Sequence, residues 1–425
     1  MSGPTETQRA GAEGPGQPRA EGPLAYLVAR FPVVSETFVM NEILEMERQG
    51  ERVELLPLRG SPDPVVHEAA VGLARRAHRP TLATVLGAQL HWLRRRPWAY
   101  ARMWVAALRG YGLRPRALAS CLYILPVSAA HARTVERLGV SHVHAHFATH
   151  AALGAWVVKA LTGVPYSVTA HSHDLTMDYP MLGVKLAGAS RVVVISDYYR
   201  DYIADALPGQ DMAAVHVIRC GVDTSRLSPR EPRADAGVPT VPIVVCPGRL
   251  VPMKGHRYLL EALSRLQREG VALRVEIAGG GALRGELEAM VRGLGLEDRV
   301  SFRGQLTHDR MLEALRGADI VCLPSVVTED GEQEGIPVAL MEAMAFGAAV
   351  ISTDTSGVAE LVRDDETGLL VPPGDVEALA EALRRLALDP DLRARLGSSG
   401  RRIVEEGYDL RTNTGRLRTL IGRSS

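Results

Sequence analysis

The chain has 425 residues, which suits two domains of ordinary size, and its formal net charge is zero, so no general attraction to nucleic acid is implied. No run of about 18 apolar residues predicts a membrane-spanning helix. The four cysteines lie far apart, in or beside apolar runs. This indicates reduced core residues of a cytosolic protein, not a disulfide framework or a metal site; they are Cys121, Cys220, Cys246 and Cys322.

The first part of the chain predicts a leader followed by a strand, a helix and a strand. Residues 1–22 are mainly Gly, Pro, Ala, Glu and Arg without the apolar centre of a secretory signal, and we expect them to be disordered. The apolar run 24–31, ended by Pro32, predicts a buried strand. Ser35-Glu36-Thr37 can then cap a helix over 38–49, and 52–58 predicts the next strand. This alternation indicates a parallel sheet.

Residues 69–135 differ in composition from the rest of the chain. They contain no Asp or Glu, ten arginines lie from Arg75 to Arg116, and three of the four tryptophans fall inside, at 92, 98 and 104. Arginine with Trp and Tyr on helical segments is typical of a surface in a lipid headgroup layer. A basic helical insertion that packs its aromatic side chains inward, or a surface for nucleic acid, would have a similar composition.

Strand–helix alternation then resumes, and the polar stretch from Gly221 to Pro242 predicts a boundary between two domains. The first domain is expected over 23–220 and the second over 221–405. Each is predicted to be a doubly wound α/β unit, with a central cleft between the two and ligands at the carboxyl ends of the strands. The predicted strands are 141–146, 165–171, 191–195, 243–246, 273–277, 300–302, 320–323, 349–352 and 369–371, and the predicted helices are 149–161, 256–268, 282–294, 310–316, 336–346, 358–362 and 375–388.

Two carboxylates flank a predicted helix start in the second domain. Glu334 precedes Gly335, Ile336 and Pro337, and Glu342 follows within the helix. Proline suits the first helical position, and glycine lets the backbone approach a ligand closely. The free N–H groups of a helix start favour an anion such as a phosphate. A sugar nucleotide would fit this arrangement, although two surface glutamates on an ordinary helix would give the same spacing.

A basic loop follows the first strand of the second domain. Gly248-Arg249-Leu250 and then Lys254-Gly255 lie at the carboxyl end of strand 243–246. Arginine offers a planar fork and lysine a point charge, and both suit a diphosphate. The three glycines 279–281 form a second loop for close approach, but they lack the dinucleotide-binding pattern, which argues against NAD.

Five histidines, at positions 144, 146, 150, 171 and 173, lie near two strand ends. His144 and His146 share a face of one strand, as two ligands of a metal would. A complete tetrahedral set with a regular spacing is missing, so no metal site is predicted. His171, at a strand end, is better placed for polar contact in the cleft.

These motifs together resemble the retaining GT-B glycosyltransferases of family 4 over roughly residues 23–420. The main carriers are the pair Glu334 and Glu342, the segment 248–255, and His171-Ser172-His173-Asp174. Residues 31–38 and 330–345 are similar to a narrower group, the colanic-acid-type exopolysaccharide glycosyltransferases. Where many members carry a Gly-rich loop after the first strand, this chain has Ser35, Glu36 and Thr37, which we expect on the acceptor side.

The resemblance implies a role for each matching residue. Glu342 would hold the ribose, Glu334 the donor sugar, and the backbone from Gly335 through Ile336 and Pro337 to Val338 the distal phosphate. Gly248, Arg249 and Lys254 would bind the diphosphate, and His171 would lie by the reacting sugar. His171, Glu334, Arg249 and Lys254 would thus be the catalytic residues. The base would lie against Arg303, Gln305 and Leu306, and a helix within 406–425 would cross back to the first domain.

The resemblance also implies an activity: transfer of a sugar from a UDP- or GDP-sugar to a glycan hydroxyl, without a metal or cofactor. We expect a lipid-linked acceptor in exopolysaccharide assembly, no nucleic-acid partner, and a cytoplasmic protein in peripheral contact with the anionic inner face of the cell membrane. A small soluble natural product as acceptor, a non-catalytic sugar-nucleotide-binding protein and an epimerase remain alternatives.

Overall fold

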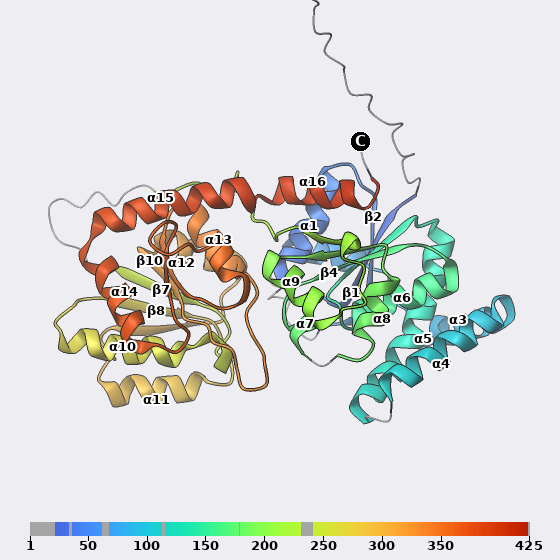
Figure 1. Cartoon of the computed structure of the whole chain (residues 1–425), viewed down its shortest axis with the longest axis horizontal. Helices are drawn as coiled ribbons and strands as arrows, with labels where there is room; N and C mark the ends of the chain where they lie inside the picture. Colours follow the sequence, from blue (N-terminus) through green and yellow to red (C-terminus); the bar gives the residue numbers. More distant parts are fainter. Residues whose placement is uncertain are drawn as a thin grey trace, which may run out of the picture.

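The computed structural model describes residues 22–33, 36–61, 68–112, 115–177, 179–230 and 241–423. Two parallel six-stranded sheets lie in sequence order, each flanked by helices (Figure 1). Within each sheet the inner strands are mostly buried, because helices cover both faces. The predicted class, two doubly wound α/β units, is confirmed. Most of the leader, Ser35 and much of the stretch before Pro242 lie outside the described residues.

The first sheet has the order β2-β1-β3-β4-β5-β6. The chain order reverses between β1 and β3, and such a reversal opens a crevice at the carboxyl ends of the strands. The strands are β1 (Leu24–Phe31), β2 (Val53–Gly60), β3 (His142–His146), β4 (Tyr166–Ala170), β5 (Arg191–Val194) and β6 (Val215–Val217), and the helices beside them are α1 (Thr37–Arg48), α6 (His150–Thr162), α7 (His173–Thr176), α8 (Leu182–Gly188), α9 (Asp197–Ala206) and the short η2 (Met212–Ala214).

The basic segment forms four helices, α2 (Glu68–Arg76), α3 (Leu82–Arg95), α4 (Pro97–Tyr111) and α5 (Pro115–Leu138), of which α3 and α4 project from the end of the molecule (Figure 1). Its aromatic side chains are divided between the core and the surface. Trp92 is fully buried and donates Nε1–H to the carbonyl of Ala129 at 2.8 Å, whereas Trp98 is 83% exposed. Part of this segment therefore packs its aromatic side chains inward, and part of it exposes them at the surface.

The second sheet has the order β12-β11-β10-β7-β8-β9, with its reversal between β7 and β10. The strands are β7 (Ile243–Pro247), β8 (Arg274–Ala278), β9 (Val300–Gly304), β10 (Ile320–Leu323), β11 (Ala349–Thr353) and β12 (Leu369–Val371). The helices are η3 (Pro252–Lys254), α10 (His256–Arg268), α11 (Arg284–Leu294), α12 (His308–Gly317), α13 (Val338–Ala345), η4 (Ser356–Glu360), α14 (Val376–Leu388) and α15 (Pro390–Gly407).

Several predicted helices differ from the structure in their bounds, and one differs in type. Helix α13 begins at Val338 instead of 336–337, because Pro337 has an extended ψ of 125° and lies just before the first helical residue. The predicted helix 358–362 is the 3₁₀ turn η4, in which Val358 N–H reaches the carbonyl of Thr355 three residues back. Helix α15 was not predicted, although Asp389 caps it and Pro390 occupies its first position.

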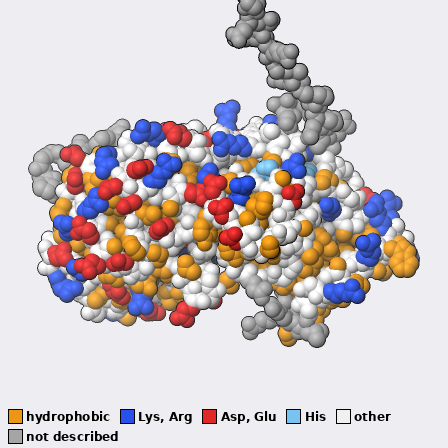
Figure 2. All heavy atoms as spheres, viewed as in Figure 1, with side chains coloured by type: hydrophobic (Ala, Val, Ile, Leu, Met, Phe, Trp, Pro, Cys, Tyr) orange, Lys and Arg blue, Asp and Glu red, His pale blue; other side chains and the backbone are white. Residues whose placement is uncertain are grey.

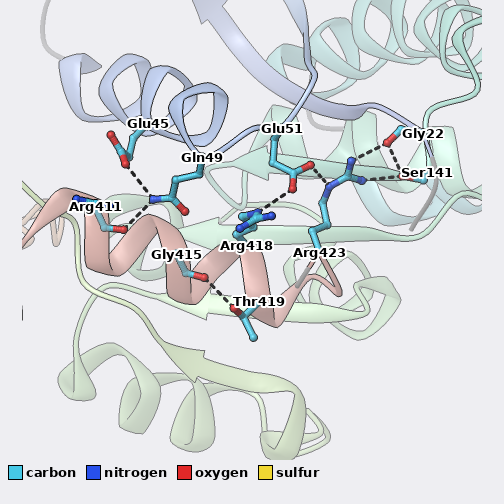
Figure 3. Close-up of polar contacts among 10 residues, drawn as sticks. All are labelled: Gly22, Glu45, Gln49, Glu51, Ser141, Arg411, Gly415, Arg418, Thr419 and Arg423. Atoms are coloured by element: carbon cyan, nitrogen blue, oxygen red, sulfur yellow. Dashed lines mark hydrogen bonds and ion pairs between the residues drawn. The ribbon is translucent and has the colours of Figure 1, made fainter. Parts of the chain in front are cut away.

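The last helix, α16 (Leu410–Leu420), crosses to the first sheet and packs beside α1, and Leu417 and Ile421 join the apolar core there (Figure 1). Figure 3 shows the polar contacts along this helix. Glu51, whose side chain is 8% exposed, pairs with Arg418 at 2.8 Å and with Arg423. The segments at Val222 and Tyr408, where the chain passes between the two sheets, lie side by side and are hydrogen-bonded at 2.9 Å.

Candidate active site

The carboxyl ends of the two sheets face each other across a cleft of about 560 Å³, within the range of ligand sites. From the first half it is lined by the segments after β1, β3, β4 and β5, and from the second half by those after β7 and β10. Both sheets therefore present the edge at which doubly wound folds bind ligands.

The cationic side of the cleft comes from the loop after β7. Arg249 is exposed there and has no acidic partner among the described residues. The Lys254 ammonium forms an ion pair with the Glu334 carboxylate, and both side chains are more than four-fifths buried. This loop leaves no room for a side chain at position 279, because a Cβ on Gly279 would lie 1.8 Å from the carbonyl oxygen of Gly248. Gly281 also passes close to this loop, since a Cβ there would lie 2.4 Å from the carbonyl oxygen of Leu250, whereas Gly280 faces Gln305.

The segment before α13 is held by contacts with both halves of the molecule. The carbonyl of Glu334 accepts hydrogen bonds from Tyr199 Oη at 3.2 Å and from Ser356 Oγ at 2.5 Å. A Cβ on Gly335 would lie 2.9 Å from Ile195 Cδ1 and 3.2 Å from the carbonyl oxygen of His171. Position 335 is therefore a glycine because the backbone passes close to other protein atoms, not because a ligand approaches it. These contacts place the tip of α13 against the segments that follow β4 and β5.

Glu342 lies on the first turn and a half of α13 with 6% of its surface exposed. Burial raises the pKa of its carboxyl to about 8. His308 Nε2, on α12, is 3.6 Å from Glu342 Oε1 and also lines the cleft. No spacing in the sequence connects His308 to Glu342, because they lie on different helices.

His171 lines the cleft from the end of β4 and belongs to a buried chain of polar side chains. Its Nε2 is 3.1 Å from His146 Nδ1, and His146 Nε2 is 3.0 Å from Glu42 Oε1. Burial opposes ionisation of Glu42, but the nearby His146 and other partners outweigh it and lower the pKa below its usual value. Burial, with the neighbouring His146 and His173, places the pKa of His171 well below its usual value. A neutral His171 ring is thus fixed by His146.

The same chain contains the group of described residues best suited to a metal. One ligand atom each of Glu42, His144 and His146 lie within 4.8 Å of one another. Both ring nitrogens of His144 already have hydrogen-bond partners, Ser167 Oγ at 2.7 Å and Thr169 Oγ1 at 3.0 Å. The alternation of His144 and His146 in the sequence indicated part of this cluster, whereas nothing indicated Glu42.

Most predicted site residues line this one cleft: Glu36, Thr37, His171, Gly248, Arg249, Lys254, Glu334, Gly335, Ile336, Pro337, Val338 and Glu342. Arg303, Gln305 and Leu306 do not line it. Arg303 is about half exposed and lies 3.6 Å from Glu276, while Gln305 is beside Gly280, next to the basic loop. Ser35 lies outside the described residues.

The chain matches two families of known proteins. Residues 36–226 match "Glycosyltransferase Family 4" and residues 230–403 match "Glycosyl transferases group 1". It is 30% identical to the putative colanic acid biosynthesis glycosyltransferase WcaL of Escherichia coli, over 94% of this chain and 99% of that protein. It is 29% identical to the amylovoran biosynthesis glycosyltransferase AmsK of Erwinia amylovora, over 86% of this chain and 90% of that protein.

A solved structure has the same fold. Anabaena Alr3699/HepE in complex with UDP-glucose superposes with a TM-score of 0.69 and 18% identity, over 95% of this chain and all of that one. The two parallel sheets facing one cleft are therefore the GT-B architecture. Sequence and fold agree that the chain is a GT-B glycosyltransferase and belongs to family 4.

Proposed function

We propose that the protein transfers a sugar, with retention of its anomeric configuration, from a nucleotide diphosphate to a hydroxyl of a lipid-linked glycan in exopolysaccharide assembly. The observation that carries the proposal is the shared cleft, in which Arg249 and Lys254 lie with the tip of α13 and with Glu334 and Glu342. The WcaL and AmsK relatives are named for colanic acid and amylovoran biosynthesis, and HepE binds UDP-glucose.

In this proposal the donor diphosphate occupies the cationic side of the cleft. Arg249 and Lys254 bind its oxygens, and the N–H groups of Gly335, Ile336 and Val338 meet the distal phosphate. Lys254, which is paired with Glu334, exchanges part of that contact for the diphosphate, and Glu334 becomes available to the hydroxyls of the donor sugar. Glu342 binds the ribose, and Arg303, Gln305 and Leu306 are proposed to lie along the base.

The chemistry proposed for this cleft is a front-face substitution. The bond from the anomeric carbon to the diphosphate breaks, the acceptor oxygen attacks from the same side, and the leaving diphosphate takes the acceptor's proton. The growing negative charge is stabilised by Arg249 and Lys254, and both substrates are held together by the two halves. His171, fixed by His146, is placed beside the reacting sugar.

The acceptor is proposed to reach the cleft from a membrane surface. Helix α3 exposes Leu82, Leu86, Leu90 and Leu93, and Trp98 projects from the start of α4. Arg94, Arg96, Arg102 and Arg109 are exposed nearby without an acidic partner among the described residues. Orange and blue side chains gather at this end of the molecule, whereas red ones lie mainly on the other half (Figure 2). Within the described residues, no helix is long and apolar enough to cross a bilayer.

The activity is tested with a panel of UDP- and GDP-sugars, with and without a prenyl-diphosphate-linked glycan in detergent. We expect donor consumption that depends on the acceptor, and a product whose anomeric proton coupling matches that of the donor. Consumption without acceptor would indicate an epimerase, and binding without turnover would indicate a non-catalytic protein. Transfer to soluble acceptors alone would contradict the lipid-linked acceptor.

The membrane contact is tested by co-sedimentation with phosphatidylglycerol-rich vesicles at low salt. The wild-type protein should sediment with the vesicles, and the double variant Leu86→Asp/Leu90→Asp should lose most of this binding because it charges the exposed apolar face of α3. Leu388→Asp is the matched control, since Leu388 is 62% exposed on the other half. No binding of the wild-type protein would rule out the contact.

The proposal requires no metal ion, because the cationic side chains and the tip of α13 supply the positive field. We therefore expect turnover of the acceptor-dependent reaction to be unchanged after dialysis against EDTA. A loss of turnover that Mg²⁺ or Mn²⁺ restores would show that the diphosphate charge is met by a bound ion instead.

A further inference from the structure

A second cavity, of about 280 Å³, opens at the carboxyl ends of β1 and β2, beside the candidate active site. Its floor is formed by Ala29 and Leu58, helix α5 closes one side with Ser120 and Tyr123, and His150 enters from the start of α6. Neither the expected acceptor-side segment nor the donor cleft includes these residues. The cavity therefore has no assigned role in the transfer.

The charged side chains around this cavity are all basic. Arg59 lines it, and Arg30 is the partner of Arg59 in the register of β1 and β2. Neither arginine has an acidic partner among the described residues, and no described carboxylate lines the cavity. Burial lowers the pKa of His150 to about 4, and the charges of Arg59, Lys185 and Arg30 act in the same direction. An uncompensated positive field of this kind attracts an anion.

A buried lysine adds to the positive electrostatic field at His150. Lys185 is 1% exposed, and its Nζ donates to the carbonyl of Thr149, next to His150, at 3.4 Å. Burying an ammonium is costly unless nearby charge offsets it. The charge of Asp174 offsets part of this cost for Lys185. An anion in the cavity would add to that effect and would also offset the repulsion between Arg59 and Arg30.

The position of the cavity relates it to both the cleft and the apolar surface. Phe147, three residues before His150, lines the cleft. His171 directly follows β4, and β4 lies two strands from β1 in the sheet, a distance of roughly 10 Å at the usual strand spacing. On the other side, Leu122 and Tyr123 of α5 are half exposed, and α5 packs against α3, where Gln89 donates to the carbonyl of Pro126. An anion here would lie between the reacting hydroxyl and the exposed leucines of α3.

We propose that this cavity, with Arg59 and His150, binds the diphosphate of the acceptor substrate, so that the sugar next to it reaches His171. The inference rests on the proposed function for the identity of the substrate. The chemistry recognised is a diphosphate, which would come either from a lipid carrier or from a free molecule. The short span to the cleft favours an acceptor whose reacting hydroxyl is close to its diphosphate.

The test compares two anion sites with two probes. Isothermal titration calorimetry would measure binding of farnesyl diphosphate and of inorganic pyrophosphate to the full-length wild-type protein and to Arg59→Gln, His150→Gln and Arg249→Gln. We expect Arg59→Gln to weaken binding at this site by roughly 10- to 100-fold, the loss of one charge-assisted contact, while Arg249→Gln retains it. Arg292→Gln is the matched control, because Arg292 is exposed on α11 in the other half.

Binding that survives Arg59→Gln and His150→Gln but disappears in Arg249→Gln would overturn the proposal, since the donor site would then be the anion site. Absence of wild-type binding would overturn it as well. Tighter binding of farnesyl diphosphate than of pyrophosphate would support a lipid carrier, and equal affinities would support the subsite while contradicting the lipid-linked acceptor. Binding through Arg59 in a protein without transfer activity would leave this site standing and refute the proposed function.

Discussion

Lys254 occupies the position at which charge grows during the proposed reaction. Its only acidic partner in the described chain is Glu334, and the pair is largely shielded from water. In such a site an ammonium contributes more to the transition state than to the bound ground state, because the diphosphate gains charge as the sugar leaves.

Lys254→Ala should therefore lower turnover by about 100- to 1,000-fold, with a smaller effect on donor affinity. Initial rates at saturating donor and calorimetric donor binding would separate the two quantities. Arg257→Ala, which removes an exposed cation just outside the cleft, is the control and should leave both nearly unchanged. Full turnover in Lys254→Ala would be inconsistent with the proposed role.

Glu342 is a buried carboxyl whose pKa in the folded protein, about 8, lies above its usual value because of burial. A group with a raised folded-state pKa favours the folded protein at low pH, and this contribution is lost as pH rises from about 4.5 to about 8. If the ionised carboxylate binds the ribose hydroxyls, donor binding must also release a proton below pH 8.

Donor affinity should thus rise with pH by up to about tenfold per unit below pH 8 and then level off. Calorimetry between pH 6 and 8.5, in buffers of different ionisation enthalpy, would detect both the affinity change and the released proton. Glu342→Gln should remove the pH dependence. A wild-type affinity that does not change over this range would argue against ribose binding by an ionised Glu342.

The element that organises the site is α13, and what positions it is the extended segment before it. Tyr199 and Ser356 hold the carbonyl of Glu334, and Gly335 passes against Ile195 and the backbone of His171. The tip of the helix is consequently tied to β4 and β5 of the opposite half.

Gly335→Ala should displace this segment, because the added methyl carbon would lie 3.2 Å from the backbone carbonyl oxygen of His171 as well as 2.9 Å from Ile195 Cδ1. A displacement of about 1 Å would lower turnover roughly 100-fold while the protein remains folded. Gly285→Ala on α11, where a Cβ meets nothing within 4 Å, is the matched control. Steady-state rates with thermal unfolding curves would check this, and an unaffected rate would mean that the cleft accommodates the methyl group.

Over the whole molecule, α16 connects the two halves by packing on the first while following the second in sequence (Figure 1). The Glu51 side chain is 8% exposed and forms ion pairs with two arginines of this region, Arg418 and Arg423 (Figure 3). Arg423 also donates to Ser141 Oγ at 2.8 Å and to the carbonyl of Gly22 at 2.6 Å. The network joins the C-terminal part of the chain to the starts of β1 and β3.

Glu51→Ala should lower the free energy of unfolding by about 3–5 kcal/mol, because it leaves the buried Arg423 without its carboxylate. Glu381→Ala removes an exposed ion pair with Arg384 and should have a much smaller effect, because water screens that pair. Urea denaturation of both variants would measure the difference. Equal losses would show that the C-terminal network does not support the packing of the two halves.

Local sequence pattern is enough to predict the two α/β units and most of the cleft. Alternating apolar runs such as 24–31 and 243–246 predict buried parallel strands from local pattern alone, and the carboxyl ends of such strands meet at one edge. Residues directly after those strands, including Arg249 and His171, were therefore predicted to come together, and the structure places them in one cavity.

Contacts between elements that are distant in the sequence follow from the packing of the whole chain. Glu42 meets His146 across 104 positions, Glu342 meets His308 across two helices, and Arg59 joins His150 only because β1, β2 and α6 pack together. Local periodicity carries no information about such pairs, because they depend on how helices and strands pack against one another. The start of α13 also depends on packing, since contacts with the opposite half keep the residues before Val338 extended.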